Sequence, residues 1–174
     1  GSGTQGALKA PGEGSSDRSY YIFAFHCNQH RLALGNVWEE SSFNKALLHL
    51  KRMRVNNPDS VWDVVMVLDA EAKALTRKWC IFEAWRCAEM DLPLNFVGGS
   101  GIVPRGSVEP LAEALRQKVE RVDLEEAGCS VESDGTMIYN AMKSSKGGLP
   151  AALGRLRRHI FNGMTYSGSY LAVS

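Results

Sequence analysis

Residues 64–89, VVMVLDAEAKALTRKWCIFEAWRCAE, decide the fold of this chain. The run opens with the apolar segment Val64–Leu68, which has no polar side to turn toward solvent and therefore predicts a strand covered on both faces. Asp69 ends the strand, and after a short loop apolar residues return at helical spacing as far as Met90. A strand that leads through a short connection into a helix is the first half of a parallel βα unit.

The position of this strand in the sheet gives the most specific structural prediction. We expect Val61–Leu68 to be a central parallel strand, with Trp79 and Phe82 of the following helix buried against the sheet. Aspartate in place of Val65 or Val67 should then unfold the domain, because an unpaired charge between two covered faces costs several kcal/mol. If the strand proved instead to be an exposed edge, this assignment and the family resemblance built on it would lose their support.

Shorter signals on either side extend the alternation of strands and helices. The expected elements are a strand at Tyr20–Phe25, a helix at Phe43–Met53, a third strand at Leu92–Val97, a helix at Val108–Val119, a short edge strand at Arg121–Leu124, a helix capped by Ser133 or Asp134 that runs to about Lys143, and a last helix from Pro150 to Phe161. This order predicts a three-layer α/β fold in which helices flank a mainly parallel sheet. Residues 1–18 are expected to be a flexible arm, 19–162 the domain and 163–174 a tail.

Composition limits the classes of function. The 174 residues carry 20 Lys and Arg against 19 Asp and Glu, so no overall field attracts nucleic acid, and the one basic cluster, at residues 155–159, is a weak footprint. The longest apolar run is far too short for a membrane span, and no signal peptide is visible. Four scattered cysteines do not form a disulfide framework. We therefore expect a soluble, intracellular protein of a reducing compartment, without a nucleic-acid partner.

The segment Leu75-Thr76-Arg77-x-Trp79-Cys80-x-x-Glu83 resembles the Toll/interleukin-1 receptor (TIR) family, in which a strand precedes a helix with a Trp-Cys-x-x-Glu signature. It is similar above all to TIR-like domains of algal and protist proteins, which also have an apolar strand leading into an Asn-Gln-His element, here Asn28-Gln29-His30. The resemblance spans Tyr20 to Phe161 and implies a flavodoxin-like arrangement. Residues 1–18 do not supply the family's first strand–loop unit, which is truncated, lost or provided by another chain.

Glu83 is the candidate catalytic residue. It lies on the same helical side as Trp79 and Cys87, and an acid on a mainly apolar stripe is unusual because burying an unpaired carboxylate is costly. The resemblance implies that this glutamate stabilises the oxocarbenium-like centre formed as nicotinamide leaves NAD, with Trp79 stacking on a ring of the ligand. The alternative is structural: Glu83 pairs with Arg86 or Lys78 at the rim of the helix, and Trp79 belongs to the core.

The remaining candidate ligand-binding residues are expected at one edge of the sheet. Asp69 follows one strand, and Asn28, Gln29 and His30 follow another. The carboxyl ends of parallel strands meet at a single edge, where ligands bind in open α/β folds. This placement predicts a crevice there, with Glu83 close to it.

A zinc site is not expected. His26, Cys27 and His30 have the spacing H-C-x-x-H, which is not a usual ligand arrangement, and Cys80 and Cys87 are seven residues apart on one helix. Buried free cysteines are common in protein cores. The sequence thus predicts neither a metal nor a cofactor, and NAD would enter only as a substrate.

Two functions from different classes follow. The first is a TIR-like interaction module, a non-catalytic component of a larger complex, which binds a protein partner or further copies of itself. The second is an NAD glycohydrolase that uses Glu83. The missing first unit favours the interaction module, because it should leave part of the sheet in need of cover.

Overall fold

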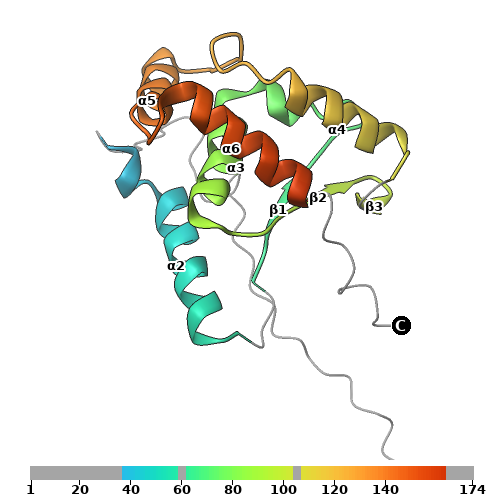
Figure 1. Ribbon diagram of the computed structural model, residues 1–174, viewed down its shortest axis with the longest axis horizontal. Coiled ribbons are helices and arrows are strands. Elements are labelled where there is room, and N and C mark those ends of the chain that lie inside the picture. Colours follow the sequence, from blue (N-terminus) through green and yellow to red (C-terminus); the bar gives the residue numbers. More distant parts are fainter. Residues whose placement is uncertain (1–36, 59–61, 104–106, 164–174) are drawn as a thin grey trace, which may run out of the picture. The chain divides into compact units, whose positions relative to one another are not determined.

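The computed structural model describes residues 37–58, 62–103 and 107–163, and these belong to one compact unit of the chain. Their elements, in chain order, are η1 (Trp38–Glu40), α2 (Ser42–Asn56), β1 (Val64–Val67), η2 (Lys73–Thr76), α3 (Lys78–Met90), β2 (Leu94–Gly98), β3 (Gly101–Ile102), α4 (Pro110–Glu120), α5 (Glu132–Lys143) and α6 (Gly148–Gly163) (Figure 1). The expected strand at 20–25, the Asn28–His30 element, the arm and residues 164–174 lie outside the described residues.

The sheet of the described part is small and mixed, with the strand order β1-β2-β3. β1 pairs with β2 in parallel, with Val64 opposite Leu94, and α3 makes the crossover between them. This confirms the predicted α/β content and the βα unit. β3 was not predicted: it pairs antiparallel with β2 through Gly98 and Gly101, and the positive φ of 108° at Gly101 is one that glycine adopts without strain.

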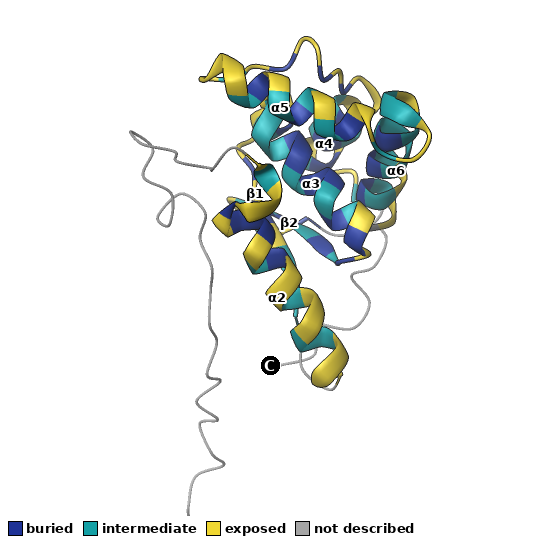
Figure 2. Ribbon diagram, turned by 90° about the vertical axis from the view of Figure 1, so that its left-hand side faces the viewer, coloured by how far each residue is buried: buried dark blue, intermediate teal, exposed yellow. Residues whose placement is uncertain are grey.

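The position of β1 differs from the prediction. Among the described residues β1 has β2 as its one neighbour, so there it is an edge strand. Its two faces also differ, because Met66 and Leu68 are buried whereas Val65 and Val67 are 54% and 74% exposed. The expectation that both faces are covered is therefore wrong for this part of the chain. Its helices α3 to α6 gather on one side of the sheet, with α6 against β2, and do not complete the predicted third layer (Figures 1 and 2).

Helix α3 forms the centre of the core. It packs mainly on α5 and α6, and Ile81 and Phe82 are completely buried. The Phe82 ring contacts three tryptophan rings, with centroid distances of 5.3 Å to Trp38, 5.9 Å to Trp79 and 5.3 Å to Trp85. Of the two side chains expected to be buried against the sheet, Phe82 is completely buried and Trp79 only partly, and both rings belong to this aromatic cluster, which joins α3 to η1.

The segment after Asp69 that we expected to form one helix up to Met90 is divided in two. Ala72 has a left-handed φ of 51°, which starts the short η2, and Arg77 is extended, so that α3 begins at Lys78. The extended segment forms a bridge with the loop before α5, where the Lys78 amide donates to the Gly128 carbonyl at 2.9 Å and the Gly128 amide donates to the Thr76 carbonyl at 2.8 Å. Since these backbone groups are used between segments, the helix cannot start earlier.

Two boundaries near the C-terminal half also differ from the prediction. Neither Ser133 nor Asp134 is the N-cap of α5, because that position belongs to Val131. Residues 121–124 form an irregular connection, with turns at Arg121 and Leu124, rather than an edge strand. Val122 and Leu124 are nevertheless buried, which explains why the sequence resembled a strand.

The basic cluster on α6 is structural. The Arg157 guanidinium donates to the carbonyls of Val119 and Val122, at 3.2 and 3.0 Å, and Arg155 pairs with Glu89 of α3. His159 Nε2 lies 2.8 Å from the Leu92 carbonyl oxygen. These side chains therefore join α6 to three other segments.

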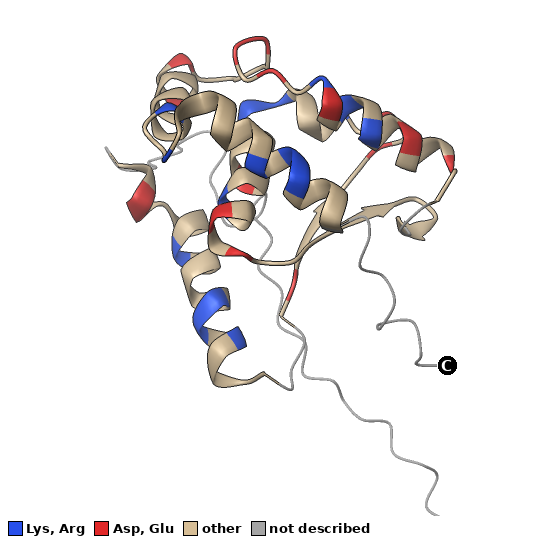
Figure 3. Ribbon diagram, in the orientation of Figure 1, with Lys and Arg blue, Asp and Glu red and all other residues tan. Residues whose placement is uncertain are grey.

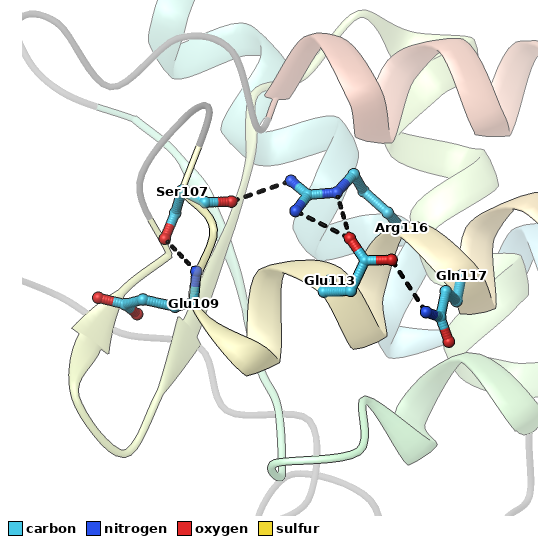
Figure 4. Close-up of polar contacts among 5 residues, drawn as sticks. All are labelled: Ser107, Glu109, Glu113, Arg116 and Gln117. Carbon is cyan, nitrogen blue, oxygen red and sulfur yellow. Dashed lines mark hydrogen bonds and ion pairs between the residues drawn. The ribbon is translucent and has the colours of Figure 1, made fainter.

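Polar contacts hold the segments that lead into the N-terminal ends of α2 and α4. The Ser41 hydroxyl accepts from the Asn44 amide at 3.1 Å and caps α2. At α4, the Ser107 hydroxyl accepts from the Glu109 amide, and Arg116 donates both to the Ser107 carbonyl and to Glu113 (Figure 4). The contacts within α4 thus hold the segment that leads into it.

Candidate functional site

Asp69 lies where the sequence placed it, at the carboxyl end of β1, but it has a structural partner. Its Oδ1 accepts from the Lys73 amide at 2.8 Å, which stabilises the turn into η2. The side chain is exposed. Its expected companions Asn28, Gln29 and His30 lie outside the described residues, so the predicted crevice between them stays a prediction.

Trp79 lies in the first turn of α3 and connects it to α5. Its indole Nε1 donates to Asp134 Oδ2 at 3.2 Å, and its ring meets Phe82 edge to face. This hydrogen bond fixes the orientation of the indole, while part of the ring stays accessible because the residue is only partly buried. No sequence signal pointed to Asp134 as the partner, since the two residues are 55 positions apart.

A cavity of about 320 Å³ opens beside Trp79, lined by Arg77, Trp79, Gly128, Cys129 and Ser130. The Cys129 thiol donates to the Val131 carbonyl at 3.2 Å and is thereby turned toward the start of α5. An indole face, a guanidinium and a hydroxyl at one opening suit a flat ligand that carries an anionic group. The volume of this cavity lies at the lower end of the range for pockets that enclose drug-sized ligands, about 300–1,000 Å³.

Glu83 lies one helical turn after Trp79. Burial raises the pKa of its carboxyl from the ordinary 4.5 to about 7, and the positive charge of Arg77 offsets part of this rise. The carboxylate makes no hydrogen bond or ion pair with any side chain in the described part of the chain. At neutral pH it is therefore divided between its protonated and ionised forms.

Glu83 does not pair with Arg86 or Lys78, as the structural alternative expected. Arg86 donates to Asn44 Oδ1 at 3.1 Å and lies 4.6 Å from the centre of the Trp38 ring. Lys78 lies along Gly135 of α5. The contacts of Arg86 and Lys78 are thus with residues other than Glu83.

The thiols on the same side of α3 as Glu83 are held in the protonated state. Burial raises the pKa of Cys80 to about 11 and that of Cys87 to about 12, and the negative charge of Glu83 adds to both shifts. Cys80, Cys87 and Cys129 are free thiols. Within residues 37–58, 62–103 and 107–163, no group of three His, Cys, Asp or Glu side chains could hold a metal ion.

A second cavity, of about 460 Å³, lies between the loop after β1 and the end of α4. Apolar residues such as Ala114 and Val122 form part of its lining, and charged residues of both signs surround them. Sequence reasoning expected a crevice at the carboxyl ends of the strands. Sequence reasoning could not identify this second cavity, because residues 121–123, which form part of its lining, were expected to belong to a strand.

One face of the sheet carries aliphatic side chains that no helix of the described residues covers. Side chains alternate across a strand, so Val65 and Val67 of β1 lie on one face, and the pairing of the strands puts Val97 and Ile102 on the same face. Ile102 is 44% exposed. Three large aliphatic side chains (Val65, Val67 and Ile102) are therefore open to solvent on one side of a small sheet.

None of the helices in the described ranges is both long and apolar enough to cross a membrane. Comparison with known proteins adds no relative: no family model, no curated protein and no solved structure matches this chain.

Proposed function

We propose that this chain is a protein-interaction module, a component of a larger assembly that binds a protein partner or further copies of itself through the open face of its sheet. The observation that carries the proposal is the exposure of Val65, Val67 and Ile102 on one face. Exposed apolar side chains that lie together mark interaction surfaces, because burying them against a partner is favourable by about 25 cal/mol per Å². The TIR-like relationship, with its three-layer fold, belongs to this proposal on the sequence signature of Trp79, Cys80 and Glu83 alone, because β1, an edge strand among the described residues, does not give it the support expected of a covered central strand.

The experiment compares two valine substitutions with one matched control. The variant Val65→Lys/Val67→Lys places two charges on the open face, and Val108→Lys places one on a valine that is 92% exposed near α4. We expect the open-face variant to lose concentration-dependent association in sedimentation velocity, or to lose proteins that the wild-type chain captures from its source, whereas Val108→Lys behaves as wild type. Equal association and equal capture by all three chains would contradict the proposal.

A second candidate is NAD glycohydrolase activity, and one observation favours it. Glu83 is a partly buried carboxylate without a hydrogen-bonding partner in the described part of the chain, and the cavity beside Trp79 offers an aromatic face and the Arg77 guanidinium. In this reaction the bond between nicotinamide and the ribose breaks with both electrons leaving on nicotinamide, and water then adds to the ribose carbon. An ionised Glu83 would stabilise the positive charge that develops there.

Nicotinamide release from NAD tests this candidate. The chain should release nicotinamide at a rate that rises with pH through about 7, where Glu83 ionises. Glu83→Gln should lower that rate by about 100-fold or more, whereas Glu132→Gln, on an exposed glutamate, should not. Absence of turnover, or equal turnover by Glu83→Gln, would exclude the enzyme.

A further inference from the structure

We propose that copies of this chain bind one another head to tail, with the basic outer part of α2 in one copy against the acidic turn at residues 120–126 of the next. This inference rests on the proposed assembly function and names a second pair of contact surfaces for it. It concerns α2 and the turn, not the open face of the sheet, so the two can be tested separately.

Helix α2 is basic throughout and only its first half belongs to the core. Its sequence, SFNKALLHLKRMRVN, contains four Lys and Arg and no acid. Leu47 is 5% exposed, but Lys51, one turn later on the same helical side, is exposed, as is the neighbouring Arg52. The second half of α2 therefore extends past the body of the described residues, as the exposed end of the helix in Figure 2 shows.

The exposed side of α2 also carries apolar surface. Leu48 and Val55 are 44% and 74% exposed and are seven residues apart, so they lie above one another on one side of the helix, beside Lys51 and Arg52. An exposed ion pair contributes only about 0–1 kcal/mol. Charges would select the orientation of a partner, and burial of Leu48 and Val55 would add affinity.

The turn after α4 has the opposite charge. Residues 120–126, ERVDLEE, hold four acidic side chains against one arginine, a formal net charge of −3. The four acids (Glu120, Asp123, Glu125 and Glu126) are all exposed. Glu125 accepts a hydrogen bond from Tyr139, but none of the four forms an ion pair with a described residue. Lys45, Lys51 and Arg52 of α2 likewise form no ion pair there, whereas Arg54 is partly buried and its charge acts on Asp63.

These two surfaces lie at opposite ends of the described part, α2 at the lower end and the acidic turn at the upper end in Figure 3. They cannot meet within one copy. A contact between two different surfaces of identical chains leaves one of each free, so that it repeats into a ring or a filament. The charge pattern thus favours an open series of copies over a two-fold dimer.

The second cavity lies directly beside the turn and can receive the apolar residues of α2. Glu126 and Asp123 stand on its rim, and Ala114, Val122 and Ala127 supply apolar lining. Lys118 and Arg121 also line it, so the groove itself has little net charge. In this arrangement the groove receives Leu48 and Val55, and the turn provides the carboxylates for Lys51 and Arg52.

Charge reversal on each surface of the full chain tests the pairing. The α2 variant is Lys51→Glu/Arg52→Glu and the turn variant is Glu120→Lys/Glu126→Lys; all four side chains are exposed and none has a hydrogen bond within the described ranges, so the fold should be kept. The control Lys146→Glu/Arg158→Glu reverses two exposed positive charges outside both surfaces, one just before α6 and one on α6. Sedimentation velocity at about 50 and 500 mM NaCl measures association, and circular dichroism verifies folding.

The wild-type chain should associate, and more weakly at the higher salt. Each reversed variant alone should associate about tenfold more weakly or worse, whereas the control should not change. A mixture of the two reversed variants should recover association as an alternating series, because the native α2 of one variant meets the native turn of the other and the two reversed surfaces also attract each other. A chain with both reversals should associate again.

Three outcomes would overturn the pairing: a wild-type chain that is monomeric at both salts, reversed variants that associate as wild type, or a mixture that does not pair. A monomeric chain that binds vesicles of phosphatidylcholine and phosphatidylserine, or RNA, through Lys51 and Arg52 would also overturn it. If association depends on Val65 and Val67 but not on these charges, the head-to-tail contact fails and the proposed function stands.

Discussion

The two faces of β1 are built from the same kind of residue and have opposite surroundings. Met66 and Leu68 turn toward the helices and are 8% and 4% exposed, whereas Val65 and Val67, their neighbours along the strand, are mostly in solvent. A strand with one solvated face normally shows alternating polar residues there. The apolar character of the second face is therefore not explained by the folding of the described residues, and this is why we connect it with binding.

The largest expected effect is on the covered face. Met66→Asp should leave the chain unfolded at neutral pH, because an unpaired charge placed among the buried side chains costs several kcal/mol, comparable to the whole net stability of about 5–15 kcal/mol. Loss of the cooperative thermal transition in circular dichroism would show this. A Met66→Asp chain that still unfolds cooperatively would mean that the two faces of β1 do not differ as described.

A cavity on the same covered face should be the next most damaging. Phe96 of β2 lies beside Met66 and is 2% exposed, so Phe96→Ala should lower the free energy of unfolding by about 3–5 kcal/mol. Val67→Ala, on the open face, is the matched control and should cost well under about 1 kcal/mol. Urea unfolding with unchanged m-values measures both, and equal losses would contradict the distinction.

The pH dependence of stability tests whether the Glu83 carboxyl is buried in the folded chain. Its pKa rises from 4.5 in the unfolded chain to about 7 in the folded one, so between these values the folded chain holds more protons and stability falls as the pH rises. Glu83→Gln lacks this penalty. Its stability relative to wild type should therefore increase between about pH 4 and pH 8 by on the order of 3 kcal/mol.

Chemical unfolding of both chains at several pH values measures this difference, with the exposed Glu132→Gln as a control whose difference from wild type stays constant. A constant difference for Glu83→Gln as well would mean that its carboxyl is solvated in the folded protein.

The smallest expected effect on stability is that of Val67→Asp. At 74% exposure the new carboxylate stays in water, and the cost should be at most about 1 kcal/mol, the range of strand propensities. This reverses the expectation drawn from the sequence, in which aspartate here unfolds the domain. The melting temperature measures it, and unfolding of Val67→Asp would show that this face is covered after all.

Much of the chain's local structure was predictable. Helices α2, α4, α5 and α6 and strands β1 and β2 all lie within a few residues of the predicted positions, because periodic apolar residues and chain breakers such as Asn57-Pro58 mark them in the sequence. The sidedness of β1 was not predictable, since a strand with apolar residues on both faces carries no signal that tells which face meets the core. The strand expected at 121–124 failed because a buried turn can have the same pattern.

The candidate site was predictable in its residue types but not in its contacts. The sequence identified Glu83 as an unusual acid on an apolar stripe, and its raised pKa agrees with that observation. The hydrogen bond from Trp79 to Asp134 and the contact of Arg86 with Trp38 join segments more than 40 residues apart, for which a single sequence gives no indication. Asn28, Gln29 and His30 stay predictions.

The hydrogen bonds of Arg157 have a consequence for the order in which the chain matures. Its guanidinium holds the carbonyls of Val119 and Val122, at the start of the acidic turn, from a position 35 or more residues later in the sequence. During synthesis that turn leaves the ribosome well before the residue that fixes it. We therefore expect the backbone of the acidic turn in a nascent chain to take its final conformation only when α6 has docked.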